Sequence, residues 1–208
     1  MMPRIGVLAL QGDFQAHAAM LAGLGAETRE VRREAHLEGL QGIVLPGGES
    51  TTMWTFLEAL DLGPALCRFA ASGGALYGTC AGVILLANEI LNPERRGLGL
   101  LDITVERNGY GRQTDSSIHR VPLEESAGTS GAGPMSSTEA TPYVEIVLIR
   151  APRIVAKGSA VQCHLNWQGS PLWVEQGRIM GTTFHPELGT DDRFHKRFLE
   201  LASAAPTS

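Results

Sequence analysis

The amino-terminal half of the chain alternates between short apolar runs and longer stretches with helical spacing. The run at residues 5–10 is apolar throughout, which predicts a strand buried on both faces, as in a parallel sheet. Further strands are predicted at residues 27–32, 42–46 and 75–79. Helices are predicted at residues 13–24, 50–60, 64–71 and 81–89. Strands that alternate with helices in this way indicate a doubly wound sheet.

The second half of the chain has a different pattern. Strands are predicted at residues 100–106, 118–123, 144–149 and 178–184, with few helices between them. The turn at Gln176-Gly177 predicts an antiparallel hairpin, and residues 191–202 predict a closing helix. The predicted fold class is therefore α/β, a doubly wound and mainly parallel sheet flanked by helices, with an antiparallel extension in the second half.

Residues 1–208 are predicted to form one domain. Residues 124–143 are rich in Ser, Gly, Thr and Pro and contain too few apolar groups to fold alone, which predicts a flexible surface loop. A linker between two domains is the alternative. It is disfavoured because the segment that follows is too short and too rich in strands to make a separate core.

The composition excludes several classes of protein. With 43% hydrophobic and 19% charged residues, the 208-residue chain has the make-up of a soluble globular protein. A net charge of −5 without a long Lys/Arg cluster argues against nucleic acid as the main partner. The three cysteines are odd in number and widely spaced, which predicts reduced thiols in the cytoplasm. The first apolar run is too short for a signal peptide or a membrane span.

Cys80 lies between a predicted strand and a predicted helix, with Gly78, Ala81 and Gly82 around it. This is the pattern of a nucleophile elbow, in which a sharp strand-to-helix turn exposes one reactive side chain. The N–H groups at the start of a helix favour the thiolate form of a cysteine placed there. A buried structural cysteine is the alternative, and for a cysteine without such neighbours it is the better interpretation.

A cysteine nucleophile requires a base, and His185 is the only one of six histidines that carries its own orienting acid, Glu187. In an extended segment residues i and i+2 point to the same side, so Glu187 can hold one imidazole nitrogen and present the other to Cys80. Taken singly, each residue could be an ordinary surface residue. His164 is unsuitable because its neighbour Cys163 would point to the opposite face of a strand. No Cys or His pair has zinc-ligand spacing, so neither a metal nor another cofactor is expected.

Acyl transfer also requires donors for an oxyanion. The backbone N–H of Ala81 is one candidate, and the loop at Gly47-Gly48, after a neighbouring strand, offers the other through Gly48. A tight turn or a phosphate-binding loop is the alternative for these glycines. The phosphate interpretation is weak, because no Walker-type lysine follows and Glu49 would repel the anion.

The Gly-Thr-Cys-Ala-Gly motif at residues 78–82 and the distant His-Pro-Glu motif at residues 185–187 resemble those of the class I, triad-type glutamine amidotransferases. Within that family the chain is similar to the glutaminase subunits of pyridoxal 5′-phosphate synthase. The segments that carry this similarity are residues 5–12, 45–53, 105–108, 111–113, 115–116 and 149–152. Two stretches depart from the pattern, since residues 124–143 are longer than usual and residues 163–167 match nothing in it.

The resemblance implies a flavodoxin-like fold and a catalytic triad of Cys80, His185 and Glu187. It also implies that glutamine is held by a set of residues on separate loops: Gly48, Glu49, Ser50, Arg107, Ile149 and Arg150. A guanidinium fork such as that of Arg107 matches the α-carboxylate of glutamine. Without the resemblance, both arginines would be interpreted as exposed charges with weak ion pairs.

The activity implied is hydrolysis of L-glutamine to glutamate and ammonia through a cysteinyl thioester. The ammonia would pass to a synthase subunit, the partner in a large hetero-oligomer, which makes pyridoxal 5′-phosphate from ribose 5-phosphate and glyceraldehyde 3-phosphate. The resemblance also implies that the lone subunit is nearly inactive. Two alternatives remain: a glutaminase serving another synthase, such as the histidine-pathway cyclase, and a catalytically silent glutamine-binding regulator.

Overall fold

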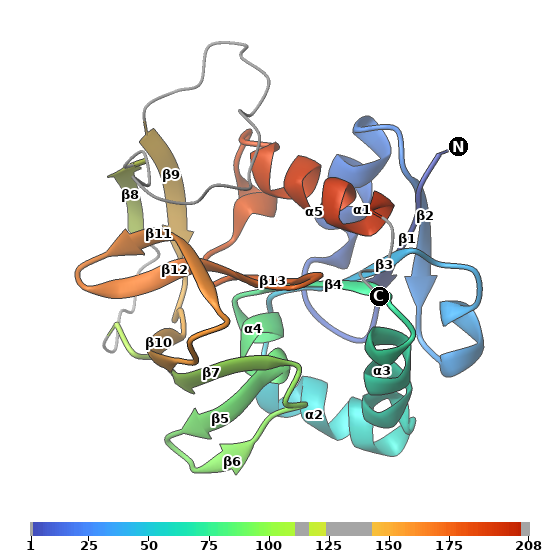
Figure 1. The fold of residues 1–208 in the computed structure, drawn as a ribbon, viewed down its shortest axis with the longest axis horizontal. Helices are drawn as coiled ribbons and strands as arrows, with labels where there is room; N and C mark the ends of the chain where they lie inside the picture. The colour runs from blue at the N-terminus through green and yellow to red at the C-terminus, as the bar shows by residue number, and fades with distance from the viewer. Residues whose placement is uncertain (1, 111–116, 124–142, 205–208) are drawn as a thin grey trace.

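A seven-stranded sheet forms the centre of the molecule in the computed structural model, which describes residues 2–110, 117–123 and 143–204 (Figure 1). The strands of this sheet are β1 (Arg4–Leu8), β2 (Glu27–Val31), β3 (Gly42–Leu45), β4 (Ala75–Thr79), β11 (Gln162–Trp167), β12 (Ser170–Gln176) and β13 (Ile179–Thr182). Their order across the sheet is β11-β12-β13-β4-β3-β1-β2.

Five of these strands are parallel, and they follow the order β2-β1-β3-β4-β13. This is the flavodoxin-like order of a doubly wound sheet. The strands β12 and β11 extend the sheet in the antiparallel direction, and the hairpin predicted at Gln176-Gly177 pairs Gln176 with Ile179. The predicted fold class is confirmed, including its antiparallel extension.

Helices cover both faces of the sheet, as Figure 1 shows. On one face lie α1 (Phe14–Gly23) and α5 (Arg193–Ser203), and on the other lie α2 (Ser50–Ala59), α3 (Leu62–Ala71) and α4 (Ala81–Leu86). Within β4, Leu76 belongs to the core under α2 and α3, whereas Tyr77 belongs to the core under α5. Both faces of the strand are therefore buried, which explains why the parallel strands are apolar without alternation.

The remaining strands form two smaller sheets beside the central one (Figure 1). One has the order β10-β7-β5-β6 and contains β5 (Ala87–Leu91), β6 (Arg95–Arg96), β7 (Leu101–Glu106) and β10 (Arg153–Lys157). The other pairs β8 (Ser117–Pro122) with β9 (Tyr143–Leu148). Two short 3₁₀ helices, η1 (Glu34–Leu37) and η2 (Pro186–Leu188), complete the described elements.

The helix predicted at residues 81–89 is too long. It ends at Leu86, and β5 begins at the next residue, Ala87. The strand is fixed by pairing with β7, in which Ile90 lies opposite Val105. Tertiary pairing thus overrides the helical pattern of the local sequence.

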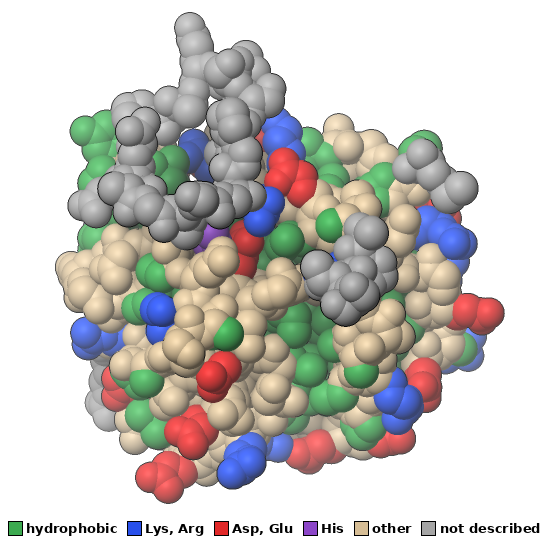
Figure 2. Space-filling model, in the orientation of Figure 1, with side chains coloured by type: hydrophobic (Ala, Val, Ile, Leu, Met, Phe, Trp, Pro, Cys, Tyr) green, Lys and Arg blue, Asp and Glu red, His purple; other side chains and the backbone are tan. Residues whose placement is uncertain are grey.

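The predicted flexible loop at residues 124–143 lies outside the described residues except for Tyr143, as do residues 111–116 of the family-like pattern. The single-domain organisation stays a prediction. No helix within the described part of the chain is both long and apolar enough to cross a membrane. On the face shown in Figure 2, the described basic side chains are interspersed with acidic ones.

Candidate active site

Four loops meet where parallel strands of the central sheet end. Gln11 follows β1, Gly48 follows β3, Cys80 follows β4 and His185 follows β13. These strands are neighbours in the sheet, so their carboxyl ends lie along one edge. Ligands of doubly wound folds bind outside this edge. The topology therefore brings Gly48, Cys80 and His185, which the sequence predicted as site residues, together with Gln11.

Cys80 occupies a strained turn between β4 and α4. Its backbone angles are φ 46° and ψ −104°, and its N–H donates to the carbonyl of Thr182 at 2.9 Å. A Cβ at Gly82 would lie 2.0 Å from the carbonyl oxygen of Leu45, so only glycine lets α4 approach β3 this closely. A Cβ at Gly78 would collide with Gly82 in the same way, at 2.7 Å. The sharp strand-to-helix turn predicted at Cys80 is present, and its role as a nucleophile stays a prediction.

His185 and Glu187 form the predicted pair. The Nδ1 atom of His185 lies 2.7 Å from Oε1 of Glu187, and the Glu187 side chain is fully buried. The predicted extended segment is wrong, because Glu187 lies in η2, which begins at Pro186. A tight turn rather than a strand brings the carboxylate back to the imidazole. The Nε2 atom of His185 is left for Cys80.

Both partners of His185 act on its protonation. Burial alone would lower the pKa of His185, but hydrogen bonds with Cys80 and Glu187 and the charges of these two groups raise the pKa to about 10. His185 is then an imidazolium at neutral pH. An imidazolium beside a cysteine favours the thiolate, which is the nucleophilic form.

A cavity of about 250 Å³ opens in front of Cys80. Its lining includes every residue predicted to bind glutamine or the oxyanion, together with two of the predicted triad: Gly48, Glu49, Ser50, Cys80, Ala81, Arg107, Ile149, Arg150 and His185. The third member, Glu187, is buried and supports His185 from outside the cavity. The structure thus unites residues that span more than half of the chain.

Glu49 and Arg107 face each other across one part of this cavity. A guanidinium nitrogen of Arg107 lies 3.5 Å from Oε1 of Glu49 and donates to the hydroxyl of Thr51 at 3.1 Å. Glu49 is also the N-cap of α2, because its carboxylate accepts the N–H groups of Thr51 and Thr52. Burial would raise the pKa of Glu49, but these hydrogen bonds, with that from the Thr52 hydroxyl, lower it to about 2.

The segment at Ile149 and Arg150 closes the cavity through its backbone. The thiol of Cys80 donates to the carbonyl of Ile149 at 3.9 Å. Arg150 has a φ of 47°, Asn108 has a φ of 54° and Gly48 has a φ of 152°. With Cys80, three of the six described non-glycine residues that have a positive φ therefore line this cavity. Such strain costs about 1–3 kcal/mol for each residue and gathers at functional sites.

Residues 7–203 match the SNO glutamine amidotransferase family. The chain belongs to this family. It is 47% identical over 203 residues to the pyridoxal 5′-phosphate synthase subunit PdxT of Deinococcus radiodurans, covering 95% of this chain and 96% of that protein. The PdxT subunit of Dictyoglomus turgidum is 44% identical, with 96% and 99% covered.

A solved structure described as a glutamine amidotransferase has the same fold. Its TM-score is 0.82 at 40% identity, and the alignment covers 96% of this chain and 99% of that one. The structure of PurLQS from Thermotoga maritima has a TM-score of 0.69, with 96% of this chain and 99% of that one covered. At 19% identity it shows the fold alone. The shared architecture is that of the central sheet and its flanking helices.

Sequence reasoning missed three residues that line the cavity of this amidotransferase: Gln11, Ile84 and Asn108. Gln11 has a clear structural role, since its Oε1 accepts the N–H of Glu49 at 2.7 Å. This contact ties the loop after β3 to the loop after β1. The position of Gln11 directly after a buried parallel strand is a signal that could have identified it.

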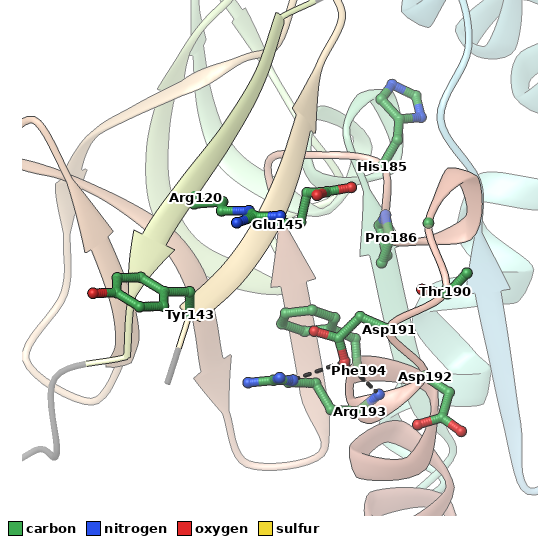
Figure 3. Close-up of a pocket in the computed structure, with 11 residues that line it drawn as sticks. Arg120, Tyr143, Glu145, His185, Pro186, Thr190, Asp191, Asp192, Arg193 and Phe194 are labelled. Carbon is green, nitrogen blue, oxygen red and sulfur yellow. Dashed lines mark hydrogen bonds and ion pairs between the residues drawn. The ribbon is translucent and has the colours of Figure 1, made fainter. Parts of the chain in front are cut away.

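A larger cavity, of about 400 Å³, lies on the other side of His185 (Figure 3). Its lining includes Arg120, Glu145 and Asp191, and the ring of His185 points away from them in Figure 3. Cys80 is not part of the described lining of this cavity. The smaller cavity is therefore the candidate active site, because it holds the nucleophile.

His164 lies apart from the site, as expected. Its Nε2 is 3.5 Å from a carboxylate oxygen of Glu175, which also accepts from Arg197 at 2.9 Å. Among the residues that the structure describes, no group of three or more His, Cys, Asp or Glu is placed to hold a metal ion.

Proposed function

We propose that this chain hydrolyses glutamine with Cys80 as the nucleophile, His185 as the acid and base, and Glu187 as the group that orients His185. The observation that carries this assignment is that Cys80 and His185 line one cavity, while Nδ1 of His185 lies 2.7 Å from Oε1 of Glu187. The same cavity presents an ion pair, Glu49 with Arg107, to a substrate.

In the first step, the Cys80 thiolate attacks the amide carbon of the glutamine side chain. The carbonyl becomes an oxyanion, for which we assign the backbone N–H groups of Ala81 and Gly48 as donors. His185 then gives its proton to the departing amide nitrogen, and ammonia and a thioester result. In the second step, neutral His185 takes a proton from water and the hydroxide attacks the thioester. The carboxylic acid that leaves ionises to glutamate, and the Cys80 thiolate is restored beside protonated His185.

The cavity suits the two charges of the amino-acid end of glutamine. Arg107 can pair with the α-carboxylate through its guanidinium fork, and Glu49 can accept from the α-ammonium group. Ser50 and the backbone at Ile149 and Arg150 line the same cavity and complete the proposed glutamine site. Both side chains of the Glu49–Arg107 pair are partly exposed, so a substrate can exchange with the pair.

The relatives named above are subunits of pyridoxal 5′-phosphate synthase. We assign this chain the same place: a glutaminase that passes ammonia to a synthase subunit in a hetero-oligomer, for assembly of pyridoxal 5′-phosphate from ribose 5-phosphate and glyceraldehyde 3-phosphate. All three cysteines are free in the structure. Free thiols are typical of the cytoplasm, where we place the complex.

The deciding experiment measures glutamate release from glutamine, with and without the synthase subunit of the source cell. We expect hydrolysis that rises when the synthase is added. Cys80→Ala should reduce it by at least about a thousandfold, as removal of a nucleophile does elsewhere, and should leave complex formation intact. Full activity in Cys80→Ala would refute the assignment. Labelling of Cys80 by an electrophilic glutamine analogue without turnover would indicate a silent binding protein.

A further inference from the structure

A row of polar side chains continues from Glu187 into the interior of the protein. The Oε2 atom of Glu187 lies 3.3 Å from Nε2 of His17, and both side chains are fully buried. The same Nε2 atom lies 3.1 Å from the hydroxyl of Thr79, the residue before Cys80. On the other edge of the ring, Nδ1 of His17 lies 2.8 Å from Nε2 of His195.

These residues come from separate elements that pack on one face of the central sheet. His17 is in α1, Thr79 ends β4, His195 is in α5 and Glu187 is in η2. Buried polar groups of this kind are costly unless they are hydrogen-bonded to one another. No step of the proposed mechanism uses His17 or His195, so their burial requires a separate explanation.

The hydrogen-bond partners decide which nitrogen of His17 carries the proton. If Nε2 carries it, its N–H lies between the hydroxyl of Thr79, which is its hydrogen-bond partner, and Oε2 of Glu187, which lies 3.3 Å away, and Nδ1 accepts from Nε2–H of His195. The remaining Nδ1 atom of His195 has no hydrogen-bond partner among the described atoms, and as an unprotonated acceptor it leaves no buried donor unpaired. The opposite tautomer would place a lone pair of His17 against the carboxylate and leave an N–H of His195 unpaired.

The charges around His17 are consistent with a neutral ring. Burial lowers the pKa of His17 well below its ordinary value, and the nearby His195 and His185 lower it further. Burial also lowers the pKa of His195 to about 4, with Asp192 acting in the opposite direction. Tyr77 packs against both rings and stays a neutral phenol, because burial raises its pKa. His17 therefore supplies a hydrogen-bond donor without adding a positive charge.

We propose that His17 is a positioning residue for the glutaminase reaction, which holds Glu187 through Oε2 so that Oε1 stays aligned with Nδ1 of His185. The inference rests on the proposed function. It adds His17 to the group formed by Cys80, His185 and Glu187. With Oε1 bonded to His185 and Oε2 against the ring of His17, rotation of the carboxylate away from the imidazole is disfavoured. Oε2 makes no hydrogen bond among the described atoms, so the N–H of His17 at 3.3 Å is the polar group that stabilises it, and loss of this group weakens the hold on His185.

Two amide substitutions separate this role from simple packing. The side-chain nitrogen of glutamine can replace Nε2 of histidine, whereas that of asparagine can replace Nδ1 only. His17→Gln should therefore still place an N–H group against Oε2 of Glu187, and His17→Asn should not. His17→Leu removes both contacts at similar volume. Tyr77→Phe is the matched control, because its hydroxyl bonds to Thr182 at 3.1 Å in the same core, outside the row of polar side chains.

The first measurement is the alkylation rate of Cys80 by iodoacetamide as a function of pH, followed by peptide mass spectrometry. It requires neither glutamine nor the synthase. Peptide mass spectrometry separates the label on Cys80 from that on Cys67 and Cys163, two thiols whose pKa values are raised by burial. A less firmly held His185 supports less thiolate. We expect the neutral-pH rate in His17→Asn and His17→Leu to fall roughly tenfold, about the effect of losing one contact to a charged group.

The second measurement is glutamine hydrolysis with the synthase subunit present. In His17→Asn and His17→Leu, kcat should fall by roughly tenfold, because a polar contact to a charged group is lost. KM should stay within about twofold of the wild-type value. His17→Gln should keep kcat within about threefold of the wild type, as should Tyr77→Phe, because both leave Glu187 with its donor.

Three outcomes would overturn the inference. One is a folded His17→Asn protein with the alkylation profile and kcat of the wild type. Another is an equal loss in His17→Gln and His17→Asn, which would indicate packing alone. The third is an equal loss in Tyr77→Phe. If the wild type itself hydrolyses no glutamine with its synthase, the proposed function fails, and the alkylation profiles still decide the role of His17.

Discussion

The nucleophile side of the cavity, formed by Cys80, His185 and Glu187, is held by the central sheet, whereas the substrate side is held by loops. On the nucleophile side, Thr79 pairs with Thr182 in adjacent parallel strands, directly before the two reactive loops. The N–H of Cys80 donates to the carbonyl of Thr182, and the Glu187 side chain has no exposure. The register of two strands thus sets the distance between nucleophile and base.

On the substrate side, the charged groups are more exposed and hold one another. The side chain of Glu49 is 41% exposed and that of Arg107 is 25% exposed, at a separation of 3.5 Å. Arg150 contributes from a loop residue with a positive φ. The difference indicates that the chemistry is preorganised while the binding groups can adjust. Changes on the nucleophile side should then lower kcat, and changes on the substrate side should raise KM.

The largest effect is expected from Glu187→Gln on the nucleophile side. The amide can present its NH₂ group to Nδ1 of His185, which favours the wrong tautomer. We expect kcat to fall by roughly 10³- to 10⁴-fold with little change in KM, as at the equivalent acid of serine triads. Steady-state glutamine hydrolysis with the synthase present measures both parameters. A rise in KM at constant kcat would show that Glu187 serves binding instead.

A smaller but substantial loss is expected from Gly47→Ala, which tests how closely the loop after β3 packs on the nucleophile side. A Cβ there would lie 2.3 Å from Cε1 of His185 and 3.3 Å from the Cβ of Cys80. Displacement of these side chains should reduce kcat by roughly a hundredfold. Gly23→Ala is the control, because a Cβ meets nothing within 4 Å there. It should leave kcat unchanged, and equal losses in both variants would contradict the prediction.

On the substrate side, Arg107→Gln should raise KM for glutamine by roughly 10- to 100-fold and leave kcat within about threefold. The reason is the loss of a charged partner for the α-carboxylate, away from the reacting atoms. Arg107→Lys keeps the charge without the fork and should give an intermediate KM. A fall in kcat at unchanged KM would place Arg107 with the reaction rather than with binding, and would remove the distinction between the two sides.

The buried parallel strands that hold the nucleophile side could be predicted from the sequence, whereas the edge strands β6, β10 and β11 could not. The parallel strands are buried on both faces, and β3 at Gly42–Leu45 lies within the predicted run 42–46. No bounds were predicted for β6, β10, β11 or β12, although the predicted hairpin at Gln176-Gly177 implies a strand where β12 lies, and β5 overlapped a predicted helix. In β11, buried Leu165 lies among the polar residues Gln162 and His164 at the edge of the sheet. Its pairing with β12 shifts register twice, which breaks the alternation that marks a strand.

Within the site, Cys80 and His185 could be predicted because the chemistry of each is carried by a few neighbouring residues at a strand end. His17 could not, since its partner His195 is 178 residues away and a histidine in a helix has no local signal. Glu49 was predicted only through a family resemblance, as a substrate contact. Its second role as the N-cap of α2 depends on where the helix begins, and helix ends are poorly defined by sequence.

The smallest effect concerns this second role of Glu49. Glu49→Gln replaces a charged cap by a neutral one, which should lower stability by about 1 kcal/mol or less, roughly 2–4 °C in Tm. The pKa of Glu49 is lowered from 4.5 to about 2 in the folded protein. Its stabilising contribution is therefore present above pH 4.5 and is lost as the pH falls through about 2.

The difference in Tm between the wild type and Glu49→Gln should accordingly stay constant from about pH 5 to pH 8 and be smaller at about pH 3.5, because a protonated Glu49 resembles glutamine. Thermal unfolding followed by circular dichroism measures it. Partial exposure of Glu49 keeps the effect modest and sensitive to salt. A difference in Tm that does not change with pH would mean that the charge of Glu49 adds nothing to the cap. The charge of Glu49 would then serve the binding of glutamine alone and would contribute nothing to the stability of the fold.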